Sequence, residues 1–278
     1  MKDNYLRVGP SYFKKSLYPT LSGDRIEILL PWSPELIRQD HGKNALSLVE
    51  IFDGFICFPE NRLEFYLKNH QGYYNTYHSL SKNPIEGDIT NTKKFITHIF
   101  GEQTEIGFDY LQLLYLKPTQ ILPILCLVSK ERATGKSTFL KWLKEIFEYN
   151  LTYLTNDSFS SNFNADWASK LLICIDEVLF QTEILTERIK YLSTTNVNKI
   201  EAKGKDRKEI EFFGKFILCS NNETSFIKID ADEIRFWVRK IDSYEKEDVH
   251  FLSKLIKEIP AFLYFLSKRQ LSTENKSR

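Results

Sequence analysis

The stretch Thr134-Gly135-Lys136-Ser137-Thr138 combines a glycine, a lysine and hydroxyl side chains in the order that suits a polyphosphate. A loop of this kind before a helix points backbone N–H groups at an anion. The lysine then reaches the β- and γ-phosphates, and the hydroxyl after it binds Mg²⁺. We expect Ala133 through Thr138 to bind a nucleoside triphosphate, with Lys136 on the phosphates and Ser137 on the metal.

The stretch departs from the general phosphate-loop template at its first glycine. The pattern G-x-x-x-x-G-K-[ST] places that glycine at position 130, where this chain has Lys130. Since Lys136 and Ser137 remain, the departure bears on the backbone angles of the loop more than on binding.

An acidic pair, Asp176-Glu177, directly follows the apolar run Leu171–Ile175. Beside a phosphate loop, one such carboxylate can join the Mg²⁺ shell and the other can orient or deprotonate the attacking water. We assign Asp176 to the metal and Glu177 to the water. The alternative is a solvated acidic pair at the end of a strand.

An amide side chain follows a third apolar run, Phe216–Cys219, in the sequence Ser220-Asn221-Asn222. A neutral amide can hydrogen-bond a γ-phosphate or the attacking water without repelling either. We assign this role to Asn221. Asparagine also favours turns, so a purely structural turn is the alternative.

A basic segment lies between the acidic pair and this asparagine. Two short alternating flanks around Gly204 predict a β-hairpin, and its tip carries Lys203, Lys205, Arg207 and Lys208 with a single acid. Such a loop suits a phosphate backbone, and we expect these four residues to contact DNA. A solvated hairpin without a partner is the alternative.

Two arginines follow the asparagine, Arg235 and Arg239. A guanidinium that reaches the γ-phosphate held by a neighbouring subunit stabilises charge in the transition state. Because the two are four residues apart on an alternating strand, they share a face, and the choice between them stays open. The structural alternative is a set of ion pairs with the nearby acids Asp230, Asp232 and Glu233.

The elements that must position these residues alternate between strand and helix from residue 121 onward. Ile121–Val128, Leu171–Ile175 and Phe216–Cys219 are continuous apolar runs, and an amphipathic helix is expected over 137–147. Continuous apolar strands separated by helices indicate an α/β fold with a parallel sheet covered on both faces, whose ligands bind beyond the carboxyl ends of the strands. A last helix is expected at about 247–268.

Four regions are expected along the chain. They are an N-terminal accessory region of unknown role (1–90), a helical lead-in (91–120), the nucleotide-binding core (121–245), and a C-terminal helical segment with a polar tail (246–278).

Composition excludes several classes of function. The 278 residues carry a formal net charge of +1, so any basic function must be local. The four cysteines lie far apart among apolar neighbours, which predicts reduced thiols of a cytoplasmic protein. Neither a signal peptide nor an apolar run near the roughly 20 residues of a membrane span is present, so no membrane partner is expected.

The motifs together resemble a superfamily III helicase domain, which is related to AAA+ ATPases, of the primase–helicase type found in phages and mobile elements. The stretches that carry the resemblance are Ala133–Phe139, Ile175-Asp176-Glu177, Lys203-Gly204-Lys205, Ser220-Asn221-Asn222 and Arg235-Phe236. The resemblance covers residues 120–241 most strongly.

The resemblance implies a three-layer phosphate-loop ATPase core that assembles into rings, usually hexamers, in the cytoplasm of a bacterial host. ATP and Mg²⁺ would lie between subunits, with Lys136, Asp176, Glu177 and Asn221 from one subunit and Arg235 from its neighbour. The basic hairpin would carry single-stranded DNA. Since no primase module is recognisable, two alternatives stay open: a separate primase or other replication protein is a partner, or the chain is a piece of a longer protein.

Two other functions stay open. One is an ATP-dependent loader or switch in replication initiation that does not unwind DNA. The other is a non-enzymatic scaffold with a degenerate nucleotide fold, an alternative motivated by Lys130.

Overall fold

The computed structural model describes residues 4–19, 25–180, 182–201, 207–228, 232–243 and 248–273. The chain forms two compact units, and each is described by itself. Unit 1 comprises Met1–Phe58 and Leu67–Tyr77, and unit 2 comprises Pro59–Tyr66 and His78–Arg278. In the described part of the chain, no helix combines the length and the apolar character that crossing a membrane requires.

Unit 1 is built from two small sheets. A four-stranded sheet has the order β3-β2-β1-β4, and a three-stranded sheet has the order β5-β7-β6. Leu6, Val8, Phe52 and Tyr74 form one buried cluster of this unit. The bounds are β1 Tyr5–Val8, β2 Ser11–Pro19, β3 Arg25–Trp32, α1 Pro34–His41, η1 Ala45–Leu48, β4 Glu50–Phe52, β5 Gly54–Ile56, β6 Asn69–His70 and β7 Tyr73–Asn75.

Unit 2 contains a five-stranded parallel sheet with the order β14-β8-β13-β10-β9. The bounds are α2 Thr90–Phe100, η2 Gly101–Gln103, α3 Thr104–Leu116, β8 Ile124–Val128, α4 Lys136–Phe147, η3 Glu148–Asn150, β9 Leu151–Leu154, α5 Asn156–Ser160, β10 Leu172–Ile175, α6 Glu183–Leu192, β11 Val197–Ile200, β12 Lys208–Glu211, β13 Lys215–Ser220, β14 Phe236–Lys240 and α7 Phe251–Lys268.

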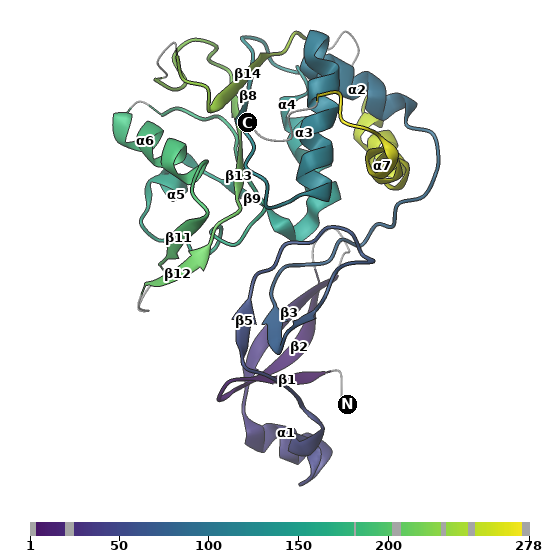
Figure 1. The fold of residues 1–278 in the computed structure, drawn as a ribbon, viewed down its shortest axis with the longest axis vertical. Helices are drawn as coiled ribbons and strands as arrows, with labels where there is room; N and C mark the ends of the chain where they lie inside the picture. Colours follow the sequence, from purple (N-terminus) through teal and green to yellow (C-terminus); the bar gives the residue numbers. More distant parts are fainter. Residues whose placement is uncertain are drawn as a thin grey trace. The chain divides into compact units, whose positions relative to one another are not determined.

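Helices cover both faces of this sheet. Helices α5 and α6 lie on one side, and α2, α3, α4 and α7 lie on the other (Figure 1). Every residue of β8, β10 and β13 is buried, which explains why these strands read as continuous apolar runs. The predicted α/β fold with a parallel sheet, preceded by a smaller N-terminal region, is confirmed.

Two boundaries and one additional strand differ from expectation. Strand β8 begins at Ile124 and not at residue 121, because Pro123 has no N–H to give to a ladder. The last helix begins at Phe251. Strand β9 was not predicted.

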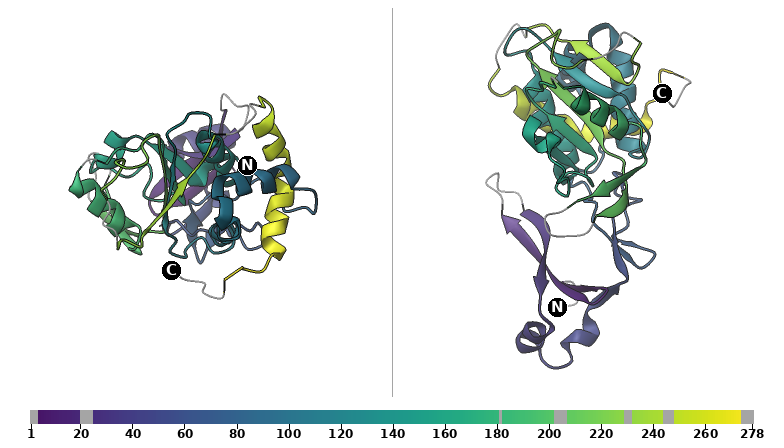
Figure 2. Two further views of the ribbon diagram at one scale, coloured as in Figure 1. Left: turned by 90° about the horizontal axis from the view of Figure 1, so that it is seen from above. Right: turned by 90° about the vertical axis from the view of Figure 1, so that its left-hand side faces the viewer.

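The predicted hairpin is present as β11 and β12, which pair antiparallel from Val197↔Glu211 to Ile200↔Lys208. Both strands project from the rest of unit 2 (Figures 1 and 2). The tip residues Lys203 and Lys205 lie outside the described residues.

Candidate functional site

The strand order of the sheet gathers three strand ends that are far apart in sequence. Because β13 lies between β8 and β10, Asn221 at the end of β13 falls between the loop after β8 and the acidic pair after β10. The strands are parallel, so all three ends share one edge, which we call the carboxyl edge. The structure thus brings together residues that span positions 133 to 221.

The loop between β8 and α4 has two residues with left-handed backbone angles, Ala133 with a φ of 56° and Gly135 with a φ of 91°. Gly135 immediately precedes α4, so the free N–H groups of this helix begin where a phosphate is expected. Lys130 is not among the described residues with positive φ. The position at which the template has its first glycine therefore does not require one here.

Lys136 is the first residue of α4 and is only 7% exposed. Its amine donates to Thr134 Oγ1 at 3.2 Å, to Asn221 Oδ1 at 3.1 Å, and to Ser129 Oγ. Burial lowers the pKa of Lys136, and the nearby carboxylates of Asp176 and Glu223 act in the opposite direction. A largely dehydrated amine that is held by side-chain oxygens can exchange those partners for an anion.

Ser137 and Asp176 face each other across the same edge. The Ser137 hydroxyl donates to Asp176 Oδ2 at 3.3 Å, and both side chains are exposed. A hydroxyl and a carboxylate are oxygen ligands of the kind that Mg²⁺ prefers when it also binds substrate phosphates. The pair therefore fits the predicted metal shell.

Glu177 occupies a left-handed backbone conformation, with a φ of 56°. Such angles are costly for a residue with a side chain, and they persist where neighbouring contacts hold them. Here the Asn156 amide donates to the Glu177 carbonyl at 3.2 Å and accepts from Leu179 N–H at 3.2 Å. The exposed Glu177 side chain thus follows Asp176 in a strained turn that the Asn156 amide holds in place.

Glu223 belongs to this edge, although no sequence pattern singled it out. Its carboxylate accepts from Lys130 N–H at 3.0 Å and from Lys240 Nζ at 3.1 Å. Desolvation favours the neutral carboxyl, but the hydrogen bond and charge of Lys240 hold the pKa of Glu223 below its usual range. Glu223 therefore ties the loop between β8 and α4 to the end of β14.

Arg235 lies at the opposite edge of the sheet, which we call the amino edge. Its carbonyl accepts from Ile124 N–H at 2.8 Å, at the start of β8. Its guanidinium makes two hydrogen bonds of 2.7 Å to Glu233, which is the ion pair that the structural alternative predicted. The hydrogen bond from Arg235 lowers the pKa of Glu233 to about 2. The structure does not bring Arg235 to the carboxyl edge of its own chain.

Arg239 pairs with Leu127 in the sheet and lies nearer the carboxyl edge. A Cβ on Gly101 would lie 3.1 Å from Arg239 Nη2, so this guanidinium contacts the turn between α2 and α3. Its Nε is buried, and no hydrogen-bond partner for it is found among the described residues.

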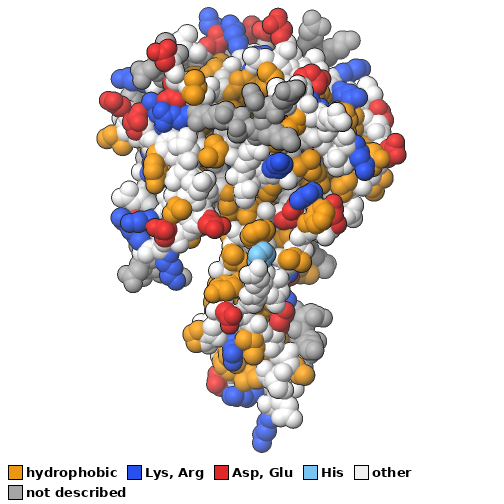
Figure 3. All heavy atoms as spheres, in the orientation of Figure 1, with side chains coloured by type: hydrophobic (Ala, Val, Ile, Leu, Met, Phe, Trp, Pro, Cys, Tyr) orange, Lys and Arg blue, Asp and Glu red, His pale blue; other side chains and the backbone are white. Residues whose placement is uncertain are grey.

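Two of the four predicted DNA contacts are described, and both belong to the hairpin. Arg207 Nε donates to Glu201 Oε2 at 2.7 Å, and Lys208 is exposed at the start of β12. Acidic and basic side chains are interspersed over the visible face of the molecule (Figure 3).

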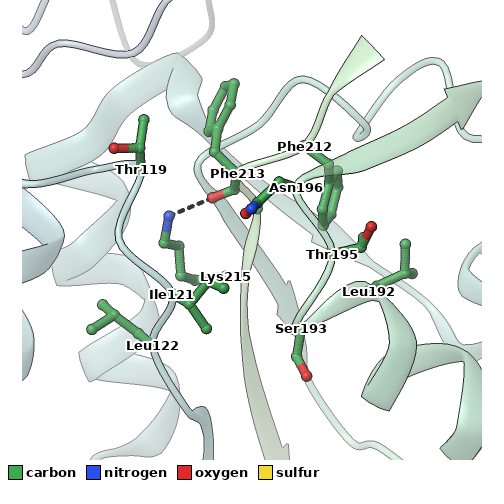
Figure 4. Close-up of a pocket in the computed structure, with 11 residues that line it drawn as sticks. Thr119, Ile121, Leu122, Leu192, Ser193, Thr195, Asn196, Phe212, Phe213 and Lys215 are labelled. Atoms are coloured by element: carbon green, nitrogen blue, oxygen red, sulfur yellow. Dashed lines mark hydrogen bonds between the residues drawn. The ribbon is translucent and has the colours of Figure 1, made fainter. Parts of the chain in front are cut away.

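A second buried lysine, Lys215, begins β13 at the amino edge and was not predicted from the sequence. Its amine donates to the Phe213 carbonyl at 2.6 Å and to the Pro118 carbonyl. It lines a polar pocket of about 10 Å³ that includes Thr119 and Asn196 (Figure 4), enough for one water molecule. Burial lowers the pKa of Lys215 to about 7.

Comparison with known sequences gives one family match. A model described as a family of unknown function (DUF5906) matches residues 127–239, which is less than half of the chain. This stretch begins at the end of β8 and contains Lys136, Asp176, Glu177 and Asn221. No curated protein matches the sequence.

Solved structures with a similar fold include the apo NrS-1 C-terminal region (305-718), with a TM-score of 0.71 at 17% identity over 96% of this chain and 67% of that chain. An A form of the same region has a TM-score of 0.72 at 18% identity, with the same coverage. A JCV helicase with a bound small molecule matches more loosely, at a TM-score of 0.41 and 12% identity over 66% of this chain and 56% of that one. The chain shares the fold of the NrS-1 C-terminal region and spans about two thirds of its length.

Proposed function

We propose that the chain is an ATP-hydrolysing, ring-forming DNA helicase that moves along single-stranded DNA during replication of a phage or mobile element. One observation carries the proposal. The amine of Lys136, the hydroxyl of Ser137, the carboxylate of Asp176 and the amide of Asn221 converge on one edge of a parallel sheet, with contacts of 3.1 and 3.3 Å between them.

Each residue of the carboxyl edge has a role that follows from its chemistry. Lys136 holds the β- and γ-phosphates of ATP, and the N–H groups of Gly135 and of the start of α4 bind the same oxygens. Ser137 and Asp176 hold Mg²⁺, which when bound neutralises charge on the phosphate oxygens. Glu177 accepts a proton from the attacking water, and Asn221 orients that water or the γ-phosphate.

Arg235 serves the nucleotide of the neighbouring subunit in this proposal. A residue that acts on a neighbour's site must lie away from its own, and Arg235 lies at the amino edge, bound to Glu233. The ring, most simply a hexamer, therefore completes each site with an arginine from the next subunit.

The hairpin supplies the contact with single-stranded DNA through Lys203, Lys205, Arg207 and Lys208. Its strands project from unit 2, and Lys208 and Arg207 are exposed. Cationic side chains on a projecting loop bind a phosphate backbone without reading its sequence. A separate primase or another replication protein would supply priming, in the cytoplasm of a bacterial host.

The test is ATP turnover by the whole chain with and without single-stranded DNA, together with its mass in the presence of a non-hydrolysable ATP analogue and DNA. We expect turnover that DNA stimulates and a ring of several subunits. The paired substitution Lys203→Ala and Lys205→Ala should remove the stimulation. Absence of ATP turnover would support the scaffold, and turnover indifferent to DNA would support the loader or switch.

A further inference from the structure

A short segment of unit 2 joins the candidate ATP site to the hairpin. We call residues 156–164 the connector. It starts at the first residue of α5, whose side chain binds the turn at Glu177, and it ends at Asn164, which binds the hairpin strand. The two anchors are both asparagine amides, and each makes two side-chain hydrogen bonds to backbone groups.

The first anchor is sensitive to the backbone of Glu177. The Asn156 amide bridges the Glu177 carbonyl and Leu179 N–H, the two groups that flank the left-handed turn. Because Glu177 has a φ of 56°, its turn is strained and is held by the contacts around it, which include these two bonds and the bond from Val178 N–H to the Cys219 carbonyl at 2.8 Å. A shift of this turn therefore displaces Asn156 and the start of α5.

Phe159 anchors the middle of the connector in the core of unit 2. Phe159 is fully buried. Its ring centroid lies 5.2 Å from that of Phe180, on which it stacks, and 6.1 Å from that of Trp167. Arg188 lies over the Phe159 ring at 5.2 Å and donates to the Ser160 carbonyl at 3.1 Å. Packed aromatic side chains transmit a displacement because they cannot be compressed.

The second anchor binds the base of the hairpin. Asn164 is 4% exposed; its amide donates to the Lys199 carbonyl at 2.8 Å and accepts from Glu201 N–H at 2.7 Å. Its own N–H donates to the Glu201 carbonyl at 3.2 Å. Strand β11 thus has β12 on one side and Asn164 on the other, so the position of Asn164 sets the position of the strand.

We infer that the connector couples the ATP site to the DNA-binding hairpin, and that Asn164 is the positioning residue at the hairpin end. This inference rests on the proposed function. Both ends are fixed by directional hydrogen bonds and the middle by packed rings, so a nucleotide-dependent change at Glu177 moves β11 and the hairpin with it. Asn164 bonds the hairpin only through backbone groups of Lys199 and Glu201 and therefore acts through the strand.

The test is an Asn164→Ala variant of the full chain, assayed for ATP turnover with and without single-stranded DNA. Basal turnover and DNA affinity should stay within about threefold of the wild type, since Asn164 bonds only backbone groups of Lys199 and Glu201 and leaves the carboxylate that holds Arg207 in place. The stimulation by DNA should be lost. A purely structural role would lower all three quantities together, so this separation is the signature of coupling.

Two further variants, each of which replaces an asparagine of the connector, control the test. Asn162→Ala removes an exposed asparagine from the same connector and should keep full stimulation. Asn164→Asp keeps the acceptor for Glu201 N–H and loses the donor to Lys199, so it should retain part of the stimulation. Asn164→Ala leaves buried backbone groups unpaired and could therefore fail to fold. In that case the loss of DNA stimulation is measured in Asn164→Asp instead.

The outcomes separate the two proposals. The coupling is overturned if Asn164→Ala keeps the full stimulation by DNA seen in the wild type. Where Asn164→Ala does not fold, full stimulation in Asn164→Asp has the same meaning. In both cases the helicase proposal still stands. A wild-type chain without ATP turnover, or without stimulation by DNA, overturns the proposed function itself. Hydrogen exchange gives a second measurement. A non-hydrolysable ATP analogue should change exchange at residues 197–201 in the wild type and in Asn162→Ala, but not in the Asn164 variants.

Discussion

The two edges of the sheet in unit 2 each hold a buried lysine, and the two lysines differ in what they bind. At the carboxyl edge, Lys136 donates to the side-chain oxygens of Ser129, Thr134 and Asn221. At the amino edge, Lys215 donates to backbone carbonyls. Side-chain oxygens can rotate away when a ligand binds the lysine amine. Backbone carbonyls of packed segments are fixed and cannot. Burial of a lysine alone is therefore no sign of function, and the exchangeability of its partners is the better guide.

The largest effect that separates the two edges is expected from the lysines themselves. Lys136→Met should lower ATP turnover by at least about 100-fold, because it removes a preorganised charge from the transferred phosphate. Lys215→Met should change turnover by no more than about threefold, since it contacts no residue of the carboxyl edge. Phosphate release under saturating ATP measures both. Equal losses in the two variants would show that the two buried lysines do not differ in function.

The second prediction tests whether the amino edge of one subunit completes the carboxyl edge of the next. Lys136→Met and Arg235→Ala subunits, each inactive alone, should regain activity when mixed, because about a quarter of the interfaces then join an intact Lys136 to an intact Arg235. Phosphate release from equimolar mixtures measures this. If Arg235 served its own subunit, no mixture would recover activity. The same mixture with Arg239→Ala tests the alternative arginine.

The third prediction concerns the pH dependence of stability. Lys215 has a folded pKa of about 7 against an ordinary value of 10.5, so between these values the unfolded chain binds more protons than the folded one. Stability from this group is therefore complete above the unfolded pKa and is lost as the pH falls toward 7. The wild-type free energy of unfolding, minus that of Lys215→Met, should rise with pH by up to ~1.4 kcal/mol per unit. Urea unfolding between pH 7 and pH 9.5 measures the difference, and a flat difference would contradict burial as the cause.

The smallest effects are expected in the loop between β8 and α4. Gly135→Ala should cost about 1–2 kcal/mol, because a Cβ is unfavourable at a φ of 91° and would lie 3.2 Å from Phe95. Ala133→Gly should be neutral or stabilising by up to about 1 kcal/mol, since glycine accepts its φ of 56°. Lys130→Gly should be slightly destabilising and leave turnover nearly unchanged. Thermal unfolding ranks the three, and a gain of activity in Lys130→Gly would show that the missing glycine matters.

The sequence predicts the carboxyl edge well because parallel strands give it a simple rule. Three apolar runs are followed by the loop that contains Lys136, by Asp176 and by Asn221. The carboxyl ends of parallel strands meet at one edge of a sheet, so these residues are expected together. The left-handed positions within the loop were not predictable, because Ala133 carries one of them without being a glycine.

Other features depend on which strands lie side by side and which residues are buried, and the sequence does not predict these. Glu223 matters because β14 lies beside β8, which brings Lys240 to its carboxylate. Lys215 escapes prediction because lysine is rarely buried. Strand β9 was missed because it is an edge strand of four residues whose Tyr153 is exposed, so it lacks a continuous apolar run.

The strand order also dictates when the loop between β8 and α4 can acquire its shape during synthesis. Strand β8 pairs with β13 and β14, both of which are made by the ribosome long after it. Until residue 240 has emerged, β8 has an open edge, and such an edge invites pairing with other chains. A protein cut short before Phe236 should therefore aggregate during synthesis, and nucleotide binding should come as one of the last events of biosynthesis.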